Sequence, residues 1–198
     1  MGGYHSAKIL LYSIDYHEIK SNYAHGWDKI PELLRQEILR SLNGQPDCLI
    51  LCNNTLHKAF DIIEPTLKLA VPFFHAVQLT AQYAAEQGHK KVLLLGTRFT
   101  MEDGFYARTL EAKGLQVEIP QAVERERIQN IQSELAAGNI LPEHKAYFTQ
   151  LLERYAHLDA VVLACTELPL AITQKITTLA IIDPIEIQCK AAVRYALA

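Results

Sequence analysis

The chain has 198 residues, of which 49% are hydrophobic and 21% charged, and its formal net charge is −3 with a pI near 6.2. This composition is ordinary for a globular protein and provides no basic surface for nucleic acid. No apolar run approaches the roughly 18 residues of a membrane-spanning helix, no export leader is evident, and the four cysteines show neither zinc-ligand spacing nor the density of a disulfide scaffold. We therefore expect a cytoplasmic protein with no metal and no nucleic-acid or membrane partner.

Strand-like apolar runs alternate with helical periodicity along nearly the whole chain, which is typical of an α/β fold with parallel strands. In the first half we expect strands at 7–14, 48–52 and 71–74, and helices at 28–43, from 57, and at 77–87. In the second half we expect strands at 91–96, 115–119, 160–165 and 179–182, and helices from 100 towards 114, at 124–137, at 142–157 and from 185.

A boundary near residues 75–78 predicts two domains. The first is an N-terminal-type α/β domain of residues 1–76, to which the last strand and helix at 179–198 return. The second is an α/β domain of residues 77–178.

The same motif follows a strand in each half of the chain. The run Leu49–Leu51 ends in Cys52-Asn53-Asn54-Thr55, and the run Val161–Ala164 ends in Cys165-Thr166-Glu167. A thiol at the carboxyl end of a strand, followed by small polar residues that open a helix, suits proton transfer to a bound anion. Two such turns predict a pseudo-symmetric cleft with one group on each face of a substrate.

A third turn, Gly96–Thr100, lies at the same edge of the predicted sheet, where ligands of parallel sheets bind. Helix N-termini there offer free N–H groups to a carboxylate, and their field is expected to lower a thiol pKa from about 8.5 towards neutrality. The hydroxyls of Thr55, Thr97, Thr100 and Thr166 suit the same carboxylate. Helix capping alone would explain any one of these turns, but not three turns together with two cysteines.

Three segments together resemble the cofactor-independent aspartate/glutamate racemase family: Cys-x-Asn-Thr-x-His at 52–57, Leu95-Gly-Thr-Arg-Phe-Thr-Met-Glu102, and Cys165-Thr-Glu-Leu-Pro-Leu170. The segment His5–Asp15 is similar to the branch that contains broad-specificity amino-acid racemases. The resemblance covers essentially the whole chain in the family's order. It implies two pseudo-symmetric α/β domains with the site between them, a homodimer, and a small amino-acid or carboxylate substrate.

The resemblance also implies proton transfer without pyridoxal phosphate or another cofactor, in which one cysteine removes the α-proton and an opposite cysteine delivers one. Cys165 matches the second-domain cysteine. Asn54, Thr55, Thr100 and Thr166 match positions that hold the substrate's carboxylate and ammonium groups. Glu167 is expected either to position the ammonium group and tune the thiol or simply to start a helix.

The first cysteine position of the family is occupied here by Asn53, and Cys52 lies one residue earlier. Because side chains alternate along a strand, this offset points Cys52 to the opposite face unless a bulge resets the turn. We therefore expect Asn53 in the site and Cys52 in the core, with Asn53, Cys52 and Cys165 as the candidate catalytic residues. An asparagine does not exchange a proton as a thiol does, so racemisation in both directions would be impaired.

Two further departures concern the N-terminus and the substrate. The chain begins where the family's second strand begins, without the usual first strand and helix, which suggests a late-assigned start or a truncated gene. Aspartate-directed members have a lysine where this chain has Ala136.

The leading interpretation is a racemase or epimerase of aspartate, glutamate or a similar amino acid. A single-cysteine relative, either a decarboxylase or an isomerase of a small carboxylic acid, is the second. A degraded, non-catalytic paralogue is the third.

Overall fold

Two parallel sheets of different size organise the chain in the computed structural model, which describes residues 3–4 and 7–198. The larger sheet has four strands in the order β4-β3-β5-β6, and the smaller pairs β1 with β2. The strands are β1 (Leu49–Ile50), β2 (Phe73–Phe74), β3 (Lys91–Gly96), β4 (Gln116–Glu118), β5 (Ala160–Ala164) and β6 (Ala180–Ile182). The predicted α/β architecture with parallel strands is confirmed.

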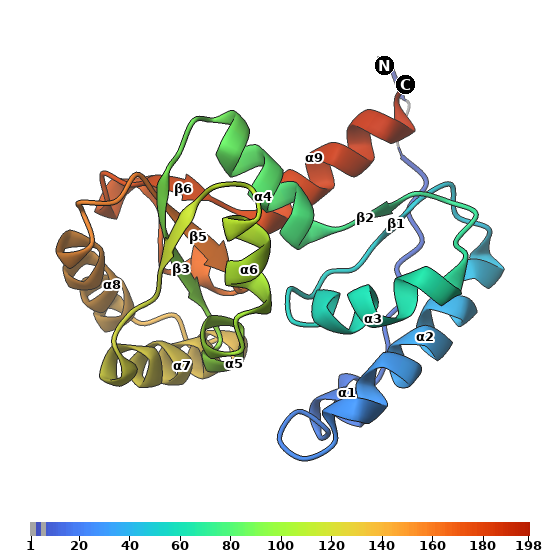
Figure 1. Cartoon of the computed structure of the whole chain (residues 1–198), viewed down its shortest axis with the longest axis horizontal. Coiled ribbons are helices and arrows are strands. Elements are labelled where there is room, and N and C mark those ends of the chain that lie inside the picture. The colour runs from blue at the N-terminus through green and yellow to red at the C-terminus, as the bar shows by residue number, and fades with distance from the viewer. Residues whose placement is uncertain (1–2, 5–6) are drawn as a thin grey trace.

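The larger sheet is buried on both faces because its central strands are continuous apolar runs. Leu93 pairs with Val161 and, on the same face, packs against helices α7 (Ala122–Ala136) and α8 (Pro142–Arg154). Leu94 pairs with Val162 on the opposite face, which α4 (Ala76–Glu86) and α6 (Phe105–Glu111) cover. Figure 1 shows these helices flanking the sheet in the larger lobe.

The smaller lobe has its own core, formed mainly between helices rather than on its short sheet. Helix α2 (Ile30–Ser41) follows a short 3-10 helix, η1 (Trp27–Lys29), and packs on α3 (His57–Leu67). Leu34 from α2 and Phe60 from α3 are both buried there. The stacked rings of Phe60 and Phe73, whose centroids are 3.7 Å apart, join α3 to β2. A short helix, α1 (Tyr16–Lys20), lies in the same lobe.

The expected strand at 7–14 is wrong. These residues form no regular element in the structure, and the side chains of Ile9 and Leu11 are 85% and 83% exposed. An apolar run forms a strand only when a neighbouring backbone pairs with it, and the smaller sheet pairs only β1 with β2 among the described residues. Residues 5 and 6 of the His5–Asp15 motif lie outside the described part of the chain.

The last strand belongs to the larger sheet, because Ala160, Val161 and Val162 of β5 pair with β6. Its expected return to the first domain is therefore wrong. Helix α9 (Pro184–Ala196) is capped by Asp183, whose carboxylate accepts the Ile185 N–H, and it runs from the larger lobe to the smaller one (Figure 1). The division into 1–76 plus 179–198 and 77–178 as a whole stays a prediction.

One side chain of α9 joins it to both short strands. Gln188 is 2% exposed, and its amide nitrogen donates to the carbonyl oxygens of Leu51 and Phe74, at 3.3 and 2.7 Å. Four short helices complete the described part of the chain: η2 (Leu42–Gly44), α5 (Arg98–Glu102), η3 (Leu168–Leu170) and η4 (Gln174–Ile176). None of the described helices has both the length and the apolar character to cross a membrane.

Candidate active site

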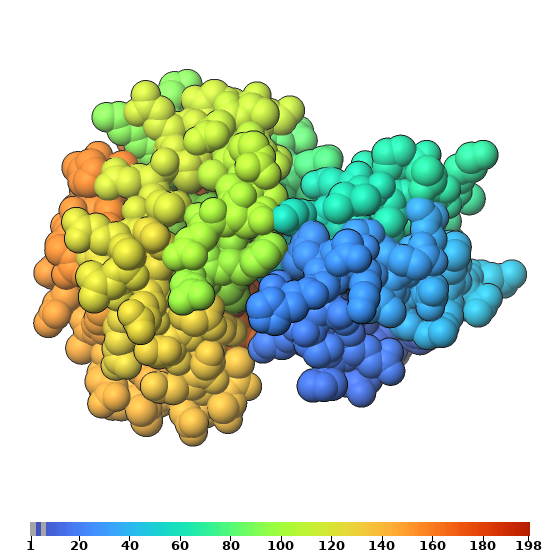
Figure 2. All heavy atoms as spheres, turned by 60° about the horizontal axis from the view of Figure 1, so that its bottom comes forward, coloured from blue at the N-terminus to red at the C-terminus, as the bar shows by residue number. Residues whose placement is uncertain are grey.

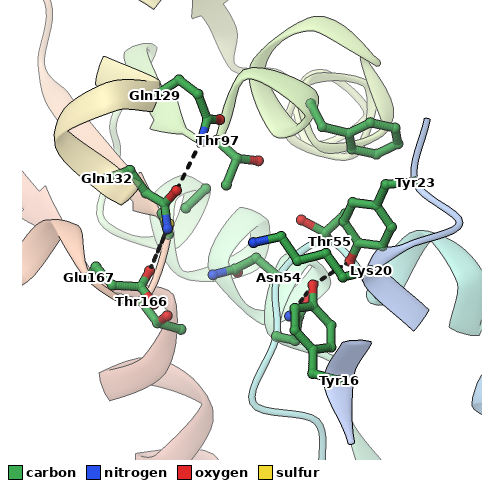
Figure 3. Close-up of a pocket in the computed structure, with 14 residues that line it drawn as sticks. Tyr16, Lys20, Tyr23, Asn54, Thr55, Thr97, Gln129, Gln132, Thr166 and Glu167 are labelled. Carbon is green, nitrogen blue, oxygen red and sulfur yellow. Dashed lines mark hydrogen bonds between the residues drawn. The ribbon is translucent and has the colours of Figure 1, made fainter. Parts of the chain in front are cut away.

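A pocket of about 180 Å³ lies between the carboxyl ends of β3 and β5 and the loops of the smaller lobe. Figure 2 shows the blue segment of the smaller lobe against the larger lobe, and Figure 3 shows the pocket itself. Side chains from both lobes line it: Tyr16, Lys20, Tyr23, Asn53, Asn54 and Thr55 from the smaller lobe, and Thr97, Phe99, Gln129, Gln132, Ala164, Cys165, Thr166 and Glu167 from the larger.

A glycine lets the two strand ends of the larger lobe approach each other. A Cβ atom at Gly96 would lie 3.1 Å from the Thr100 side chain and 3.2 Å from the Ala164 carbonyl oxygen, closer than most real contacts. Thr97 then caps α5, with its hydroxyl accepting the Thr100 N–H at 3.2 Å. The turn after β3 is therefore held directly beside the residue that precedes Cys165.

Cys165 and Glu167 form a hydrogen-bonded pair on the larger-lobe side of the pocket. The Cys165 thiol, 7% exposed, donates to a Glu167 carboxylate oxygen 3.0 Å away. Burial, followed by the hydrogen bond to Glu167, raises the thiol pKa well above its usual range, and the N–H groups of Glu167 and Thr166 do not offset this. The expected lowering of the thiol pKa by a helix N-terminus is wrong, because the sulfur is buried and a carboxylate faces it.

The Glu167 carboxyl group stays ionised beside this neutral thiol. Burial raises its pKa, but hydrogen bonds from Cys165, Thr166 and Gln132 outweigh burial and leave the pKa lowered overall. The Gln132 amide donates to the carboxylate at 3.4 Å. The larger-lobe side of the pocket therefore presents a protonated thiol and one negative charge.

Asn53 lines the pocket, as expected from its place in the motif, whereas Cys52 does not. Cys52 is exposed rather than in the core, so the expected burial of its side chain is wrong. The strand β1 ends at Ile50, two residues earlier, and the alternation that predicted a core position no longer applies. Partial burial and the neighbouring Cys189 raise the Cys52 pKa.

Three of the four predicted threonines line the pocket, namely Thr55, Thr97 and Thr166. Thr100 does not line the pocket, because its side chain is fully buried. Its hydroxyl oxygen lies 3.3 Å from that of Thr55 and 3.0 Å from that of Thr97. Thr100 therefore positions pocket hydroxyls from both lobes instead of reaching a ligand itself.

Two polar groups in the pocket have no partner among the described residues. Asn54 is 7% exposed, and its amide oxygen is buried without a hydrogen bond inside the described ranges. Lys20 lines the pocket from the end of α1, and no carboxylate of residues 3–4 and 7–198 pairs with it. Figure 3 shows both side chains directed towards the middle of the pocket. The exposed Lys20 ammonium group is available to an anionic group of a ligand, whereas the buried Asn54 oxygen is closed off from the pocket space.

Sequence reasoning did not find Tyr16, Lys20 or Tyr23. Asp15 caps α1 by accepting the His17 N–H at 3.0 Å, and residues 16 and 20 then share one helix face. This spacing was the available signal, but only the tertiary structure turns that face towards the pocket. Tyr23 follows in the next turn, and its hydroxyl oxygen lies 2.6 Å from that of Tyr16.

His57 supports the first turn without reaching the pocket. The fully buried ring accepts the Ala76 N–H at Nε2, 3.0 Å away, so its Nδ1 carries the proton that is donated to the Asn53 carbonyl oxygen at 2.8 Å. Burial, followed by repulsion from His75, lowers the His57 pKa to about 3. His57 is a neutral brace between the Asn53 turn and α4.

Lys58 holds the two lobes together at the rim of the pocket. Its ammonium group lies 2.6 Å from an Asp103 carboxylate oxygen and 4.6 Å from the centre of the Trp27 ring. Trp27 in turn stacks on Phe99, with centroids 4.7 Å apart. A charge pair and stacked rings together therefore keep the smaller lobe against α5.

One group of potential metal ligands lies away from the pocket, at Glu134, Glu143 and His144. His144 already uses both ring nitrogens, bonding Glu134 and accepting the Leu141 N–H. We assign it a structural role at the start of α8.

The model of the Asp/Glu/hydantoin racemase family matches residues 2–192 of this chain. The chain belongs to this family. The predicted resemblance is thereby confirmed at the level of the family.

Individual relatives agree. The broad specificity amino-acid racemase RacX of Bacillus subtilis (strain 168) is 27% identical over 157 residues, which are 77% of this chain and 66% of that protein, slightly less than two thirds of its length. An aspartate racemase homologue from Pyrococcus horikoshii OT3 superposes with a TM-score of 0.86 at 32% identity, and the match covers all of this chain and 87% of that chain. Picrophilus torridus aspartate racemase shares the fold, with a TM-score of 0.75 at 23% identity over 90% of this chain and 76% of that chain.

Proposed function

We propose that this protein is an amino-acid racemase that needs no pyridoxal phosphate and acts on aspartate, glutamate or a similar small amino acid. Family membership supports an isomerase of amino acids. The observation that carries the proposal is the protonated Cys165 thiol beside Glu167 in a pocket with polar groups on both sides. In the proposed reaction Cys165 exchanges the α-proton on one face of the substrate.

The charges of the pocket support an amino-acid ligand with its ammonium group towards Glu167. That carboxylate suits a positive group. When the substrate ammonium group binds Glu167, part of the negative charge that raises the thiol pKa is neutralised, so thiolate forms more readily in the complex than in the free protein. Substrate binding and activation of Cys165 are therefore coupled.

The carboxylate end of the substrate is assigned to the hydroxyl groups and the cation. Thr55, Thr97 and Thr166 are pocket hydroxyls suited to a carboxylate. Lys20 adds a full positive charge on the smaller-lobe side, which favours a substrate with a second carboxylate. This supports aspartate or glutamate although the chain has Ala136 at the lysine position of aspartate-directed members.

A second candidate rests on Asn53. An amide in place of the first thiol favours a single-cysteine reaction, such as decarboxylation or isomerisation of a small carboxylic acid, in which protonation occurs on one face only. A homodimeric assembly remains part of the main proposal.

The test follows L- and D-aspartate and L- and D-glutamate in deuterated buffer by proton NMR and chiral chromatography. A racemase inverts the substrate and incorporates deuterium at the α-carbon. A single-cysteine enzyme gives exchange or decarboxylation without inversion, and a degraded paralogue gives neither. Either of the last two results contradicts the proposal.

Two cysteine variants make this test specific. Cys165→Ala is expected to abolish inversion, a loss of about a thousandfold or more. Cys189→Ala is the matched control, because that thiol is exposed on α9 and does not line the pocket. Equal activity of both variants would exclude Cys165 as the proton-transfer group.

A further inference from the structure

The smaller-lobe side of the pocket holds a pair of phenols where the sequence lacks a thiol. Tyr16 and Tyr23 both line the pocket, and their hydroxyl oxygens lie 2.6 Å apart. Figure 3 shows the two hydroxyls meeting on the side away from Thr166 and Glu167. Cys165 is hydrogen-bonded to Glu167, so the phenols and the thiol lie on opposite sides of the space that a ligand would fill.

Asn53 directs a donor at this pair, and its orientation is determined by a backbone contact. Its side-chain oxygen accepts the Leu56 N–H at 3.0 Å. The amide nitrogen therefore faces the other way and donates to the Tyr16 hydroxyl oxygen at 3.2 Å. Because an amide nitrogen only donates, the Tyr16 oxygen must accept this bond, and its own proton stays available.

Tyr23 is placed to supply a second donor to the same oxygen. Burial, followed by the neighbouring Tyr16, raises the Tyr23 pKa far above its usual range, so Tyr23 stays protonated. Its proton can then point at Tyr16. The Lys20 ammonium group, one helical turn after Tyr16 on the same face of α1, adds positive charge to this side. Two donors and a cation stabilise negative charge on the Tyr16 oxygen.

We propose that Tyr16 is the second proton-transfer residue, acting on the substrate face opposite Cys165, with Tyr23 and Asn53 as positioning residues. In one direction the Cys165 thiolate takes the α-proton, and the Tyr16 hydroxyl proton forms the new C–H bond, so that the electron pair of the O–H bond stays on oxygen as a phenolate. In the other direction the Tyr16 phenolate takes the α-proton and the Cys165 thiol delivers one. No redox partner is required.

This inference rests on the proposed racemase function and explains how two-sided proton transfer proceeds despite Asn53. The experiment follows each enantiomer of the amino acid that the wild type racemises, in deuterated buffer, with Tyr16→Phe and Cys165→Ala. Tyr16→Phe is expected to lose inversion by about a hundredfold or more while one enantiomer still exchanges its α-proton through Cys165. Cys165→Ala is expected to retain exchange of the other enantiomer only.

Three further measurements keep the outcomes distinct. Tyr23→Phe retains the Tyr16 phenol and removes one donor, so it should slow inversion about tenfold without altering exchange on the Cys165 face. Tyr155→Phe is the control, since it deletes a phenol that donates to Glu124 at 2.7 Å outside the pocket. Circular dichroism and thermal melting verify that each variant folds.

The proposal is supported if Tyr16→Phe exchanges the α-proton of only one enantiomer and Cys165→Ala exchanges that of only the other. Inversion by Tyr16→Phe within a few-fold of wild type overturns it, as does equal loss of exchange from both enantiomers in folded Tyr16→Phe protein. A wild type that inverts no substrate overturns the proposed function instead, and this inference with it.

Discussion

The two sides of the pocket are built in different ways. The larger-lobe side stands on β3 and β5, which are buried over the five residues at which they pair. The smaller-lobe side stands on α1 and on the turn after a two-residue strand. A packed sheet positions Cys165, whereas individual hydrogen bonds from His57, Leu56 and Tyr23 position the groups that face it.

This difference indicates which side of the site tolerates change. A side chain at the end of a buried strand is held by many contacts, so one substitution nearby leaves its position intact. A side chain held by a few hydrogen bonds is displaced when one of them is lost. We therefore expect the chemistry of the smaller-lobe side to vary more readily than that of the Cys165 side, and four predictions test this comparison.

The largest effect is expected from restoring a thiol to the smaller-lobe side. In a Tyr16→Phe background, Asn53→Cys places a thiol at a position that lines the pocket. Inversion should recover by about a hundredfold relative to Tyr16→Phe, because a thiol exchanges protons and a phenyl ring does not. Chiral chromatography of aspartate and glutamate measures this. Asn53→Ser in the same background is the control, and equal rates in both double variants would contradict the prediction.

The second effect concerns the brace behind Asn53. The His57 pKa is lowered to about 3 in the folded protein and is about 6.5 when unfolded, so the unfolded state binds more protons between these values. Stability is therefore expected to fall as pH drops below about 6.5, by about 2 kcal/mol at pH 5.

Urea unfolding at pH 7 and pH 5 tests this brace. In His57→Gln the difference between the two pH values should shrink by about 2 kcal/mol. His157→Gln is the matched control, because that ring is exposed. If the difference in unfolding free energy between the two pH values is unchanged in His57→Gln, another titrating group causes the loss of stability at pH 5.

A smaller effect is expected from the unpaired cation. Lys20→Met should raise the KM for aspartate or glutamate about tenfold, because a partly exposed charge pair contributes on the order of 1 kcal/mol. The KM for an amino acid with an uncharged side chain, such as alanine, should change little. Lys190→Met, on α9 and paired with Glu186, is the control. Equal changes for both classes of substrate would exclude a charge-specific role.

The smallest effect is expected on the larger-lobe side itself. Glu167→Gln removes one of the influences that raise the Cys165 pKa, so the pKa should fall and the thiolate fraction at pH 7.5 should rise. Alkylation of Cys165 by iodoacetamide should accelerate several-fold, while burial continues to hold the pKa up. Peptide mass spectrometry separates Cys165 from the exposed Cys52 and Cys189. Slower alkylation would contradict the predicted direction.

The fold was predictable wherever burial on two faces leaves a continuous apolar run. The strand at 91–96 agrees with β3, and the strand at 160–165 extends one residue beyond β5. The same reasoning failed at 7–14, which form no strand. An apolar run indicates that the segment favours burial, but it does not show whether a partner strand is present. The last strand was found, but its sheet depends on long-range pairing with β5.

The site was predictable where a motif ends a strand, and not where a loop folds over it. Cys165, Asn53 and Asn54 line the pocket as the motifs predict. The raised Cys165 pKa was missed because sequence adjacency does not reveal that the Glu167 side chain turns back to the sulfur. Tyr16 and Tyr23 were missed because only tertiary packing brings α1 to the pocket.

The bonds from Gln188 to Leu51 and Phe74 span 137 and 114 positions along the chain. A ribosome therefore synthesises the smaller lobe first, but the last partners of β1 and β2 emerge only when the C-terminal helix leaves the exit tunnel. Contacts of such separation form late and slowly during folding. The lobe that carries Tyr16 and Asn53 is thus begun first and completed last, and any nascent chain released before α9 lacks the side-chain bonds that join Leu51 to Phe74.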